Sequence, residues 1–378
     1  MHKRCLAAAG LLLGAAPSLF ANDAVEPIVV TATRTARTVD ETLASVTVIT
    51  RQEIERQQAS SVQDVLRGVP GLSIANNGGP GKATSVFLRG TESDHALVLI
   101  DGVKVGSATL GTTAFQHIPV EQIERIEIVR GPRSSLDGSE AIGGVIQIFP
   151  RKGGGPTRPY LKFGGGSFRT YDAAAGVSGG GRHGWFNLSA SGITTDGFNA
   201  CNGKPSPNGA GCFVIEPDKD GYRNVSGSAR AGYRFANGAE VEVNALRAEG
   251  ENRFDGGFVN ESRSVQQVVG SRLRFAPTAP WHVTLAAGQS RDESDNFKDG
   301  IFKSRFDFQR ASRPAGVSGR ASSSSRIASP SSGGSAGAGS TAGVSVFAAT
   351  RSSGSILPSA RSGSGRICWI RARFKSTA

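Results

Sequence analysis

A strict alternation of apolar and polar residues governs the chain from about residue 157 to residue 310. Every odd position in 225–235 is apolar or small, while the even positions are mostly polar, and the same pattern recurs at 186–191, 239–245 and 281–285. A period of two places successive side chains on opposite faces of a β-strand. Long strands with one apolar and one polar face are typical of a membrane barrel whose apolar face meets lipid.

A soluble β-domain also alternates, but its apolar face is internal and its strands are rarely so long. Beyond the N-terminus the chain has no apolar run of the roughly 20 residues that a spanning helix needs, so it would enter a membrane only as a closed barrel. Residues 1–21 begin with Lys3 and Arg4, continue through an apolar core and end in small residues. This pattern predicts a cleaved signal peptide and an exported protein.

Export permits a disulfide between Cys201 and Cys212, which enclose a loop rich in Gly, Pro and Asn. The alternative is that these residues are two unrelated free thiols. Cys5 would leave with the signal peptide, and Cys368 would stay unpaired.

Residues 46–156 have the local signals of a small α+β domain. Thr50 and Glu53 have the spacing of a capping box and predict a helix over 51–58. Ser61 and Asp64 repeat that signal before a second helix, which Pro70 and Gly71 would end. Short apolar runs predict strands, and a Gly-rich turn at 76–81 separates the first two of them; these runs are 72–74, 85–88, 96–100 and 126–129.

The segment 22–45 contains the β-branched run Ile28 to Thr31. Such a run is either the first strand of the following domain or a segment that adds itself to the sheet edge of another protein. The five His residues and the scattered carboxylates form no catalytic constellation, so we expect no enzyme.

Several motifs in residues 26–310 resemble those of the TonB-dependent outer-membrane receptors, and most closely those of the receptors for cobalamin (vitamin B12). They are IVVTA at 28–32, SVQDVLRGVPGL at 61–72, FLRGT at 87–91, VLIDGV at 98–103, RGPRS at 130–134 and AIGGVI at 141–146. The resemblance implies a signal peptide (1–21), a TonB box and linker (22–45), an α+β plug domain (46–156) and an antiparallel transmembrane β-barrel (157–310). The implied site is the outer membrane of a Gram-negative bacterium, and the implied function is active uptake of cobalamin.

The resemblance also assigns roles to individual residues. The TonB-binding residues would be Ile28, Val29, Val30, Thr31 and Ala32. The substrate-binding residues would lie in two plug loops: Asn76, Asn77, Gly78 and Gly79, and Val105, Gly106, Ser107, Ala108 and Thr109. Arg89, Arg130 and Arg133 would form ion pairs with barrel carboxylates; the alternative is that they are solvated loop charges.

Three aspartates in Gly-rich segments are candidate calcium ligands. Asp218 and Asp220 lie in an Asp-x-Asp-Gly sequence, and Asp255 lies further along the chain. Carboxylate oxygens are the ligands that calcium prefers, and the resemblance places acidic calcium loops in a comparable position. The alternative is that these aspartates merely form turns.

Residues 311–378 have a different composition. From 308 to 378 the chain has ten Lys or Arg residues and no Asp or Glu, which accounts for most of its net charge of +12. This segment is either a disordered basic tail or an out-of-frame translation.

Only about eight strands fit between 158 and 310, and a barrel of about eight strands is filled by its own side chains, whereas plugged transporters have about 22. We therefore expect an incomplete barrel from a truncated or frameshifted receptor, unless partners complete it. A siderophore or haem receptor, a passive barrel or adhesin, and a non-functional product remain the alternatives to a cobalamin receptor.

Overall fold

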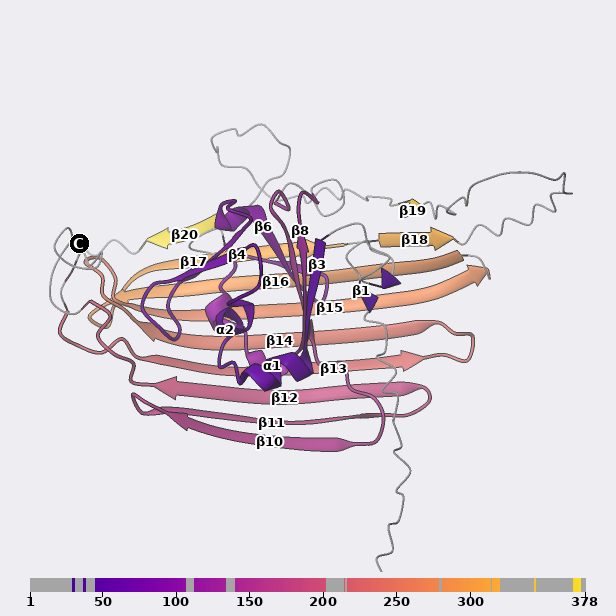
Figure 1. Cartoon of the computed structure of the whole chain (residues 1–378), viewed down its shortest axis with the longest axis horizontal. Coiled ribbons are helices and arrows are strands. Elements are labelled where there is room, and N and C mark those ends of the chain that lie inside the picture. Colours follow the sequence, from indigo (N-terminus) through magenta and orange to yellow (C-terminus); the bar gives the residue numbers. More distant parts are fainter. Residues whose placement is uncertain are drawn as a thin grey trace, which may run out of the picture.

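The computed structural model describes residues 45–106, 112–133, 140–201, 214, 216–278 and 281–313, and short strands at 29–30, 37–38, 315–319, 343–344 and 370–374. Two parts make up this structure: a small α+β unit, and a large antiparallel sheet on which the unit lies (Figure 1). We call the small unit the plug and strands β10 to β17 of the sheet the wall. No helix among the described residues has the length and apolar character needed to cross a membrane.

The plug is built on a five-stranded sheet in the order β3-β8-β9-β6-β7. Its strands are β3 (Ser45–Thr50), β8 (Ile123–Arg130), β9 (Gly144–Pro150), β6 (Ala96–Ile100) and β7 (Val103–Val105). Only the β6–β9 pair is parallel, and a separate hairpin joins β4 (Leu72–Asn76) to β5 (Thr84–Leu88). The predicted strands at 72–74, 85–88, 96–100 and 126–129 are all confirmed.

Two capped helices cover this sheet. The hydroxyl of Thr50 accepts from the Glu53 amide before α1 (Arg51–Gln57), and the hydroxyl of Ser61 accepts from the Asp64 amide before α2 (Val62–Leu66). Both caps are as predicted. Three short 3-10 helices follow: η2 (Ser93–His95), η3 (Phe115–His117) and η4 (Val120–Gln122).

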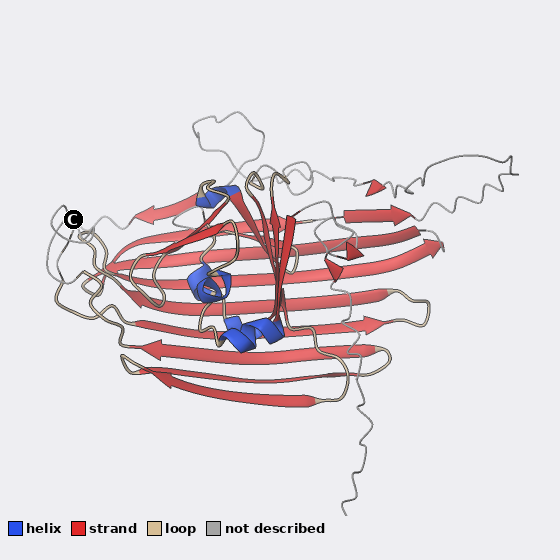
Figure 2. Ribbon diagram, viewed as in Figure 1, coloured by secondary structure: helices blue, strands red, loops and turns tan. Residues whose placement is uncertain are grey.

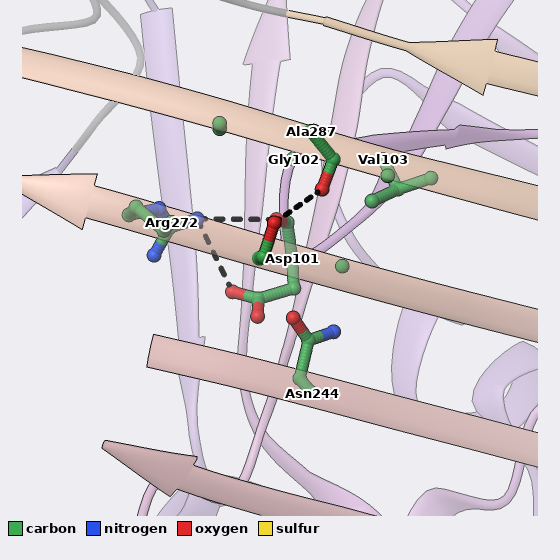
Figure 3. A pocket seen from close by; sticks show the side chains of 10 residues that line it. Asp101, Gly102, Val103, Asn244, Arg272 and Ala287 are labelled. Atoms are coloured by element: carbon green, nitrogen blue, oxygen red, sulfur yellow. Dashed lines mark hydrogen bonds and ion pairs between the residues drawn. The ribbon is translucent and has the colours of Figure 1, made fainter. Parts of the chain in front are cut away.

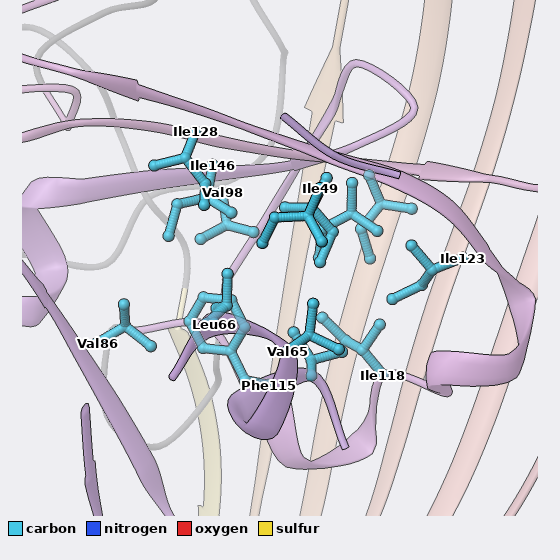
Figure 4. Close-up of a cluster of buried hydrophobic side chains, with 14 of the residues drawn as sticks. Ile49, Val65, Leu66, Val86, Val98, Phe115, Ile118, Ile123, Ile128 and Ile146 are labelled. Carbon is cyan, nitrogen blue, oxygen red and sulfur yellow. The ribbon is translucent and has the colours of Figure 1, made fainter. Parts of the chain in front are cut away.

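The core of the plug lies between α2 and the sheet (Figure 4). Leu66, Ile126, Ile128 and Ile146 are fully buried there. Each such side chain contributes about 1.5–3 kcal/mol by leaving water. The plug therefore has an apolar core of its own.

The wall contains eight consecutive antiparallel strands, each paired with the next along the chain (Figure 2). They are β10 (Arg158–Gly166), β11 (Thr170–Gly180), β12 (Gly184–Thr195), β13 (Tyr222–Arg234), β14 (Glu240–Arg253), β15 (Glu261–Thr278), β16 (Trp281–Lys298) and β17 (Ile301–Ser312). The predicted number of about eight strands before residue 310 is confirmed. The sheet does not close, and short strands β18 (Ala315–Gly319), β19 (Gly343–Val344) and β20 (Ile370–Phe374) join it.

The two faces of the wall differ as the alternation predicts. On the outward face, Phe163, Val225 and Val243 are 74%, 52% and 50% exposed. On the inward face, Asn187, Glu242 and Gln266 are only 2–3% exposed. The inward face is mostly polar, with a few buried apolar side chains such as Val268, so the plug is docked through a largely polar surface.

Candidate functional site

The turn between β6 and β7 is a buried contact of the plug with the wall. Asp101 and Gly102 adopt left-handed conformations with φ of 52° and 82°, as a tight Asp-Gly hairpin turn requires. The Asp101 carboxylate accepts from Arg230 Nη2 and lies 3.5 Å from Arg272 Nη2, which also donates to the Asp101 carbonyl at 3.1 Å. Figure 3 shows Arg272 reaching Asp101 from the wall.

Glu242 completes this cluster from β14. Its Oε1 lies 3.5 Å from Arg230 Nη1 and 3.5 Å from Arg272 Nη1, so two arginines are shared by two carboxylates. The Asp101, Arg230 and Glu242 side chains are 2%, 6% and 4% exposed. Buried charges require such pairing, because each would otherwise be stranded away from water.

The same network includes Lys152, near the C-terminal end of the plug. Lys152 Nζ lies 3.7 Å from Glu242 Oε2 and 3.8 Å from Glu240 Oε1, and it sits 4.5 Å above the Trp185 ring. Trp185 Nε1 in turn donates to Glu242 at 3.2 Å. The wall therefore holds the plug both at its β6–β7 turn and where the chain leaves it.

Other plug carboxylates also face cations of the wall. Glu121 accepts from Lys162 Nζ at 2.6 Å, and Glu140 forms an ion pair with Arg310. In these pairs, as at Asp101, the carboxylate belongs to the plug and the cation to the wall. This is the reverse of the predicted plug arginines and barrel carboxylates.

The three predicted arginines form no ion pair with a wall carboxylate among the described residues. Arg130 donates to the Pro70 carbonyl at 2.7 Å and to the Thr47 and Ser45 hydroxyls at 2.6 and 3.3 Å, so its donors serve the plug itself. Burial, followed by repulsion from Arg89, lowers the pKa of Arg130. Arg133 Nε and Nη2 are buried without a hydrogen-bond partner among the described residues. Among the described residues the predicted ion pairs are therefore not formed, and Arg130 contacts oxygens of the plug instead.

The first predicted substrate loop lies against the rim of the wall. Asn76 Oδ1 accepts from the Gly78 and Gly79 amides at 3.1 and 2.6 Å, so this side chain shapes the loop. A Cβ atom added to Gly78 would stand 2.7 Å from Ala200, and one added to Gly79 would stand 3.0 Å from Phe198. The glycines allow the loop to approach the segment that follows β12.

Lys82 ends this loop inside the plug–wall interface. Its Nζ donates to Asn252 Oδ1 at 2.8 Å, the Asp220 carbonyl at 2.9 Å and the Pro80 carbonyl at 3.2 Å. The residue is 2% exposed, and burial lowers its pKa to about 8. Nearby, burial lowers the pKa of His117 to about 4, and its Nδ1 lies 3.2 Å from the Tyr222 hydroxyl, which donates to the Gln116 carbonyl at 2.8 Å.

The second predicted substrate loop is described only in part. Val105 is buried in β7 and Gly106 follows it, while Ser107, Ala108 and Thr109 lie outside the described residues. Of the predicted TonB-binding residues, Val29 and Val30 form strand β1 (Val29–Val30), which pairs with β2 (Arg37–Thr38). Ile28, Thr31 and Ala32 lie outside the described residues, as do residues 1–21.

Two of the three predicted calcium ligands come together. Carboxylate oxygens of Asp218 and Asp255 lie within 4.8 Å of one another and of Glu216. Asp220 instead accepts from the Ala200 amide through Oδ2 at 2.8 Å. Burial, followed by the charges of Asp220, Glu216 and Asp218, raises the pKa of Asp255, and both of its oxygens are buried without a hydrogen-bond partner among the described residues. This donor set fits a hard, oxygen-binding cation.

Cys201 is disulfide-bonded. Its predicted partner, Cys212, lies outside the described residues, so the pairing stays a prediction.

Sequence reasoning missed the residues that hold the plug to the wall. These are Lys82, Asp101, Arg230, Glu242 and Arg272. Charged residues occupy alternate, inward-facing positions of β13 and β14. This pattern could have indicated the interface, because charges on a buried face need partners.

A family model for the TonB-dependent receptor plug domain matches residues 38–145. A vitamin B12 transporter from Photobacterium profundum is 34% identical over 307 residues, which cover 79% of this chain and 48% of that protein. A vitamin B12 transporter from Vibrio cholerae is 34% identical over 322 residues, covering 79% of this chain and 51% of that protein. The chain therefore spans about half the length of the curated relatives that it matches.

Solved structures share the fold at lower identity. The siderophore receptor PiuA from Acinetobacter baumannii matches with a TM-score of 0.60 at 14% identity, over 76% of this chain and 44% of that one. The ferric enterobactin receptor PfeA from Pseudomonas aeruginosa matches with a TM-score of 0.57 at 17% identity, over 72% and 46%. The copper transporter OprC matches with a TM-score of 0.58 at 20% identity, over 73% and 43%.

Proposed function

The chain belongs to the TonB-dependent outer-membrane receptor family, and from this premise we propose that it serves the active uptake of cobalamin. The observation that carries the proposal is its 34% identity to vitamin B12 transporters over 79% of its length. The solved siderophore and copper receptors share only the fold at 14–20% identity, so they favour no particular substrate. A siderophore receptor remains the alternative function.

The docking of the plug suits a transport cycle without covalent chemistry. The plug has an apolar core to which the wall contributes Val268 of β15, and it also meets the wall through ion pairs and hydrogen bonds. Water can replace such polar contacts when the plug shifts, whereas an apolar interface would expose surface at a cost of about 25 cal/mol per Å². Substrate would bind from outside, and rearrangement of the plug would open a path inward.

In this proposal the energy for that rearrangement comes from TonB. Residues Ile28 to Ala32 would pair with an edge strand of TonB through main-chain hydrogen bonds, which tolerate many side chains while tension is applied. The extended backbone of Val29–Val30, already in strand β1, supports this role. The plug loops at 76–79 and 105–109 would contact the substrate.

We also propose a calcium ion at Glu216, Asp218 and Asp255. Three carboxylates whose oxygens lie within 4.8 Å of one another repel unless cations or protons neutralise them. Lys298 already pairs with Glu216, and a bound ion would neutralise the remaining charge of Asp218 and Asp255. The ion would fix the segment 216–220 that lies beside the plug loop. The ion would stabilise the structure of this part of the rim and take no part in transport itself.

Competition binding tests the substrate. Outer membranes that contain the chain should bind radiolabelled cyanocobalamin above the level of membranes without it. Unlabelled cyanocobalamin should displace the label, and ferric enterobactin should not. Saturable binding of the ferric siderophore, with no binding of cyanocobalamin, would replace this proposal by the alternative.

A further inference from the structure

Lys82 is the one plug lysine among the described residues whose ammonium group is enclosed by the wall. It is 2% exposed and belongs to the loop 76–82, which joins the hairpin strands β4 and β5. A lysine at this depth must have its donors satisfied, because a buried ammonium group without partners is strongly disfavoured.

The three acceptors of Lys82 come from both sides of the interface. Pro80 belongs to the loop itself, the Asp220 carbonyl lies just before β13, and Asn252 lies near the end of β14. The charges of Asp220 and Asp255 also favour the ammonium form. One group therefore connects the loop to the wall where β13 begins and β14 ends.

Among the described residues, the other contacts between the loop and the wall are steric. Phe198 packs against Gly79, and the ring of Tyr222 packs so closely on Gly81 that an added Cβ atom would stand 2.0 Å from it. Such packing limits how near the loop can come, but flat rings do not fix its position along the rim. Directional hydrogen bonds to a charged donor do so, and they are stronger than neutral ones.

We propose that Lys82 is a positioning residue that clamps the loop 76–82 to the rim of the wall. The clamp holds Asn77, Gly78 and Gly79 in one geometry beside the segment 197–201. That geometry would preorganise the loop for a ligand and reduce the entropy lost on binding. Only this last step rests on the proposed function; the clamp itself does not.

Hydrogen exchange of the loop amides tests the clamp without any ligand. In the full chain, reconstituted in outer-membrane lipid vesicles, Lys82→Met should speed exchange at 77–82 by about tenfold or more, because a charged hydrogen-bond donor is lost. Exchange at 96–100, in the plug sheet, should not change. Lys162→Met is the matched control, since it removes another plug–wall ammonium contact, at Glu121, away from the loop.

A double-mutant cycle separates a clamp from general loosening. Asn252→Ala removes the side-chain acceptor, so it should also speed exchange at 77–82, and the double variant should exceed Lys82→Met by little. The proposal would be overturned if the effects of the two substitutions on exchange were fully additive. It would also be overturned if exchange at 77–82 did not change in Lys82→Met, or if exchange at 96–100 rose by the same factor.

Amine labelling provides a test that needs no Lys82 variant. In the unmodified chain, an acetylating reagent should label Lys82 at least about tenfold more slowly than the half-exposed Lys162, and Asn252→Ala should reduce that difference. Equal labelling of the two lysines would contradict the clamp.

Binding of cyanocobalamin forms a separate arm of the experiment. Lys82→Met should weaken the binding of cyanocobalamin at least about fivefold, because the loop would no longer be preorganised. If the unmodified chain binds no cyanocobalamin, the proposed substrate fails while the exchange data still decide the clamp. If binding is present and unaffected by Lys82→Met, the loop's role in recognition is wrong.

Discussion

At the scale of single residues, the charges in the plug–wall interface are arranged in shared pairs. Asp101 and Glu242 share Arg230 and Arg272. Removal of one carboxylate would leave the two arginines with only one compensating negative charge. Such a cluster is costly to break even though its net contribution to stability is small. We therefore expect Asp101 to govern how firmly the β6–β7 turn stays docked.

Replacing Asp101 with Asn should loosen the docking of the plug by about 3–5 kcal/mol, because it leaves two wall arginines with one carboxylate. Protease sensitivity of the β6–β7 turn in outer-membrane vesicles measures this change. Asp94→Asn is the matched control, since the Asp94 side chain is 55% exposed and belongs to the same plug. Equal protease sensitivity of the two variants would show that Asp101 does not hold the turn.

The residue types of the β6–β7 turn are recognisable in the sequence, but its partners are not. Asp and Gly, the residue types at 101 and 102, are typical of a tight turn. Arg230 lies 129 positions away, and nothing local connects the two. The same limitation explains the error at Arg130, because only the folded plug brings the Pro70 carbonyl and the Thr47 hydroxyl to its guanidinium group.

At the scale of elements, the helices and strands that could be predicted were predicted from local sequence signals. The caps at Thr50 and Ser61 start their helices as expected, and the period of two identifies strands β12, β13, β14 and β16. Loops were harder, because their geometry depends on distant contacts. Glu216 lies two positions before Asp218 in the sequence and was overlooked, and only folding brings Asp255 to both of them.

Calcium should order the rim segment that contains these carboxylates. Hydrogen exchange at 216–221 should slow when calcium is added to chelator-treated protein, and Glu216→Gln should weaken the effect because it removes one charged ligand. Glu249→Gln is a control, since Glu249 is an exposed carboxylate of β14. Exchange that is indifferent to calcium would leave these residues as turn formers.

At the scale of the whole molecule, the plug resembles a small domain that sits on a polar surface. Its core consists of plug residues together with Val268 of the wall, several of its carboxylates pair with wall cations, and the wall turns apolar residues to the opposite side. This arrangement agrees with a barrel in lipid that holds a movable plug. The alternation predicted the wall, and motif resemblance predicted the plug; their polar docking emerged only from the structure.

The most direct test of a TonB-driven receptor separates binding from uptake. Deletion of residues 28–32 should abolish uptake of radiolabelled cyanocobalamin by cells that have TonB but no other cobalamin receptor, while surface binding stays unchanged. Deletion of the preceding residues 22–26 is the matched control and should leave both intact. Uptake that survives the loss of 28–32, or binding that disappears together with uptake, would contradict the account.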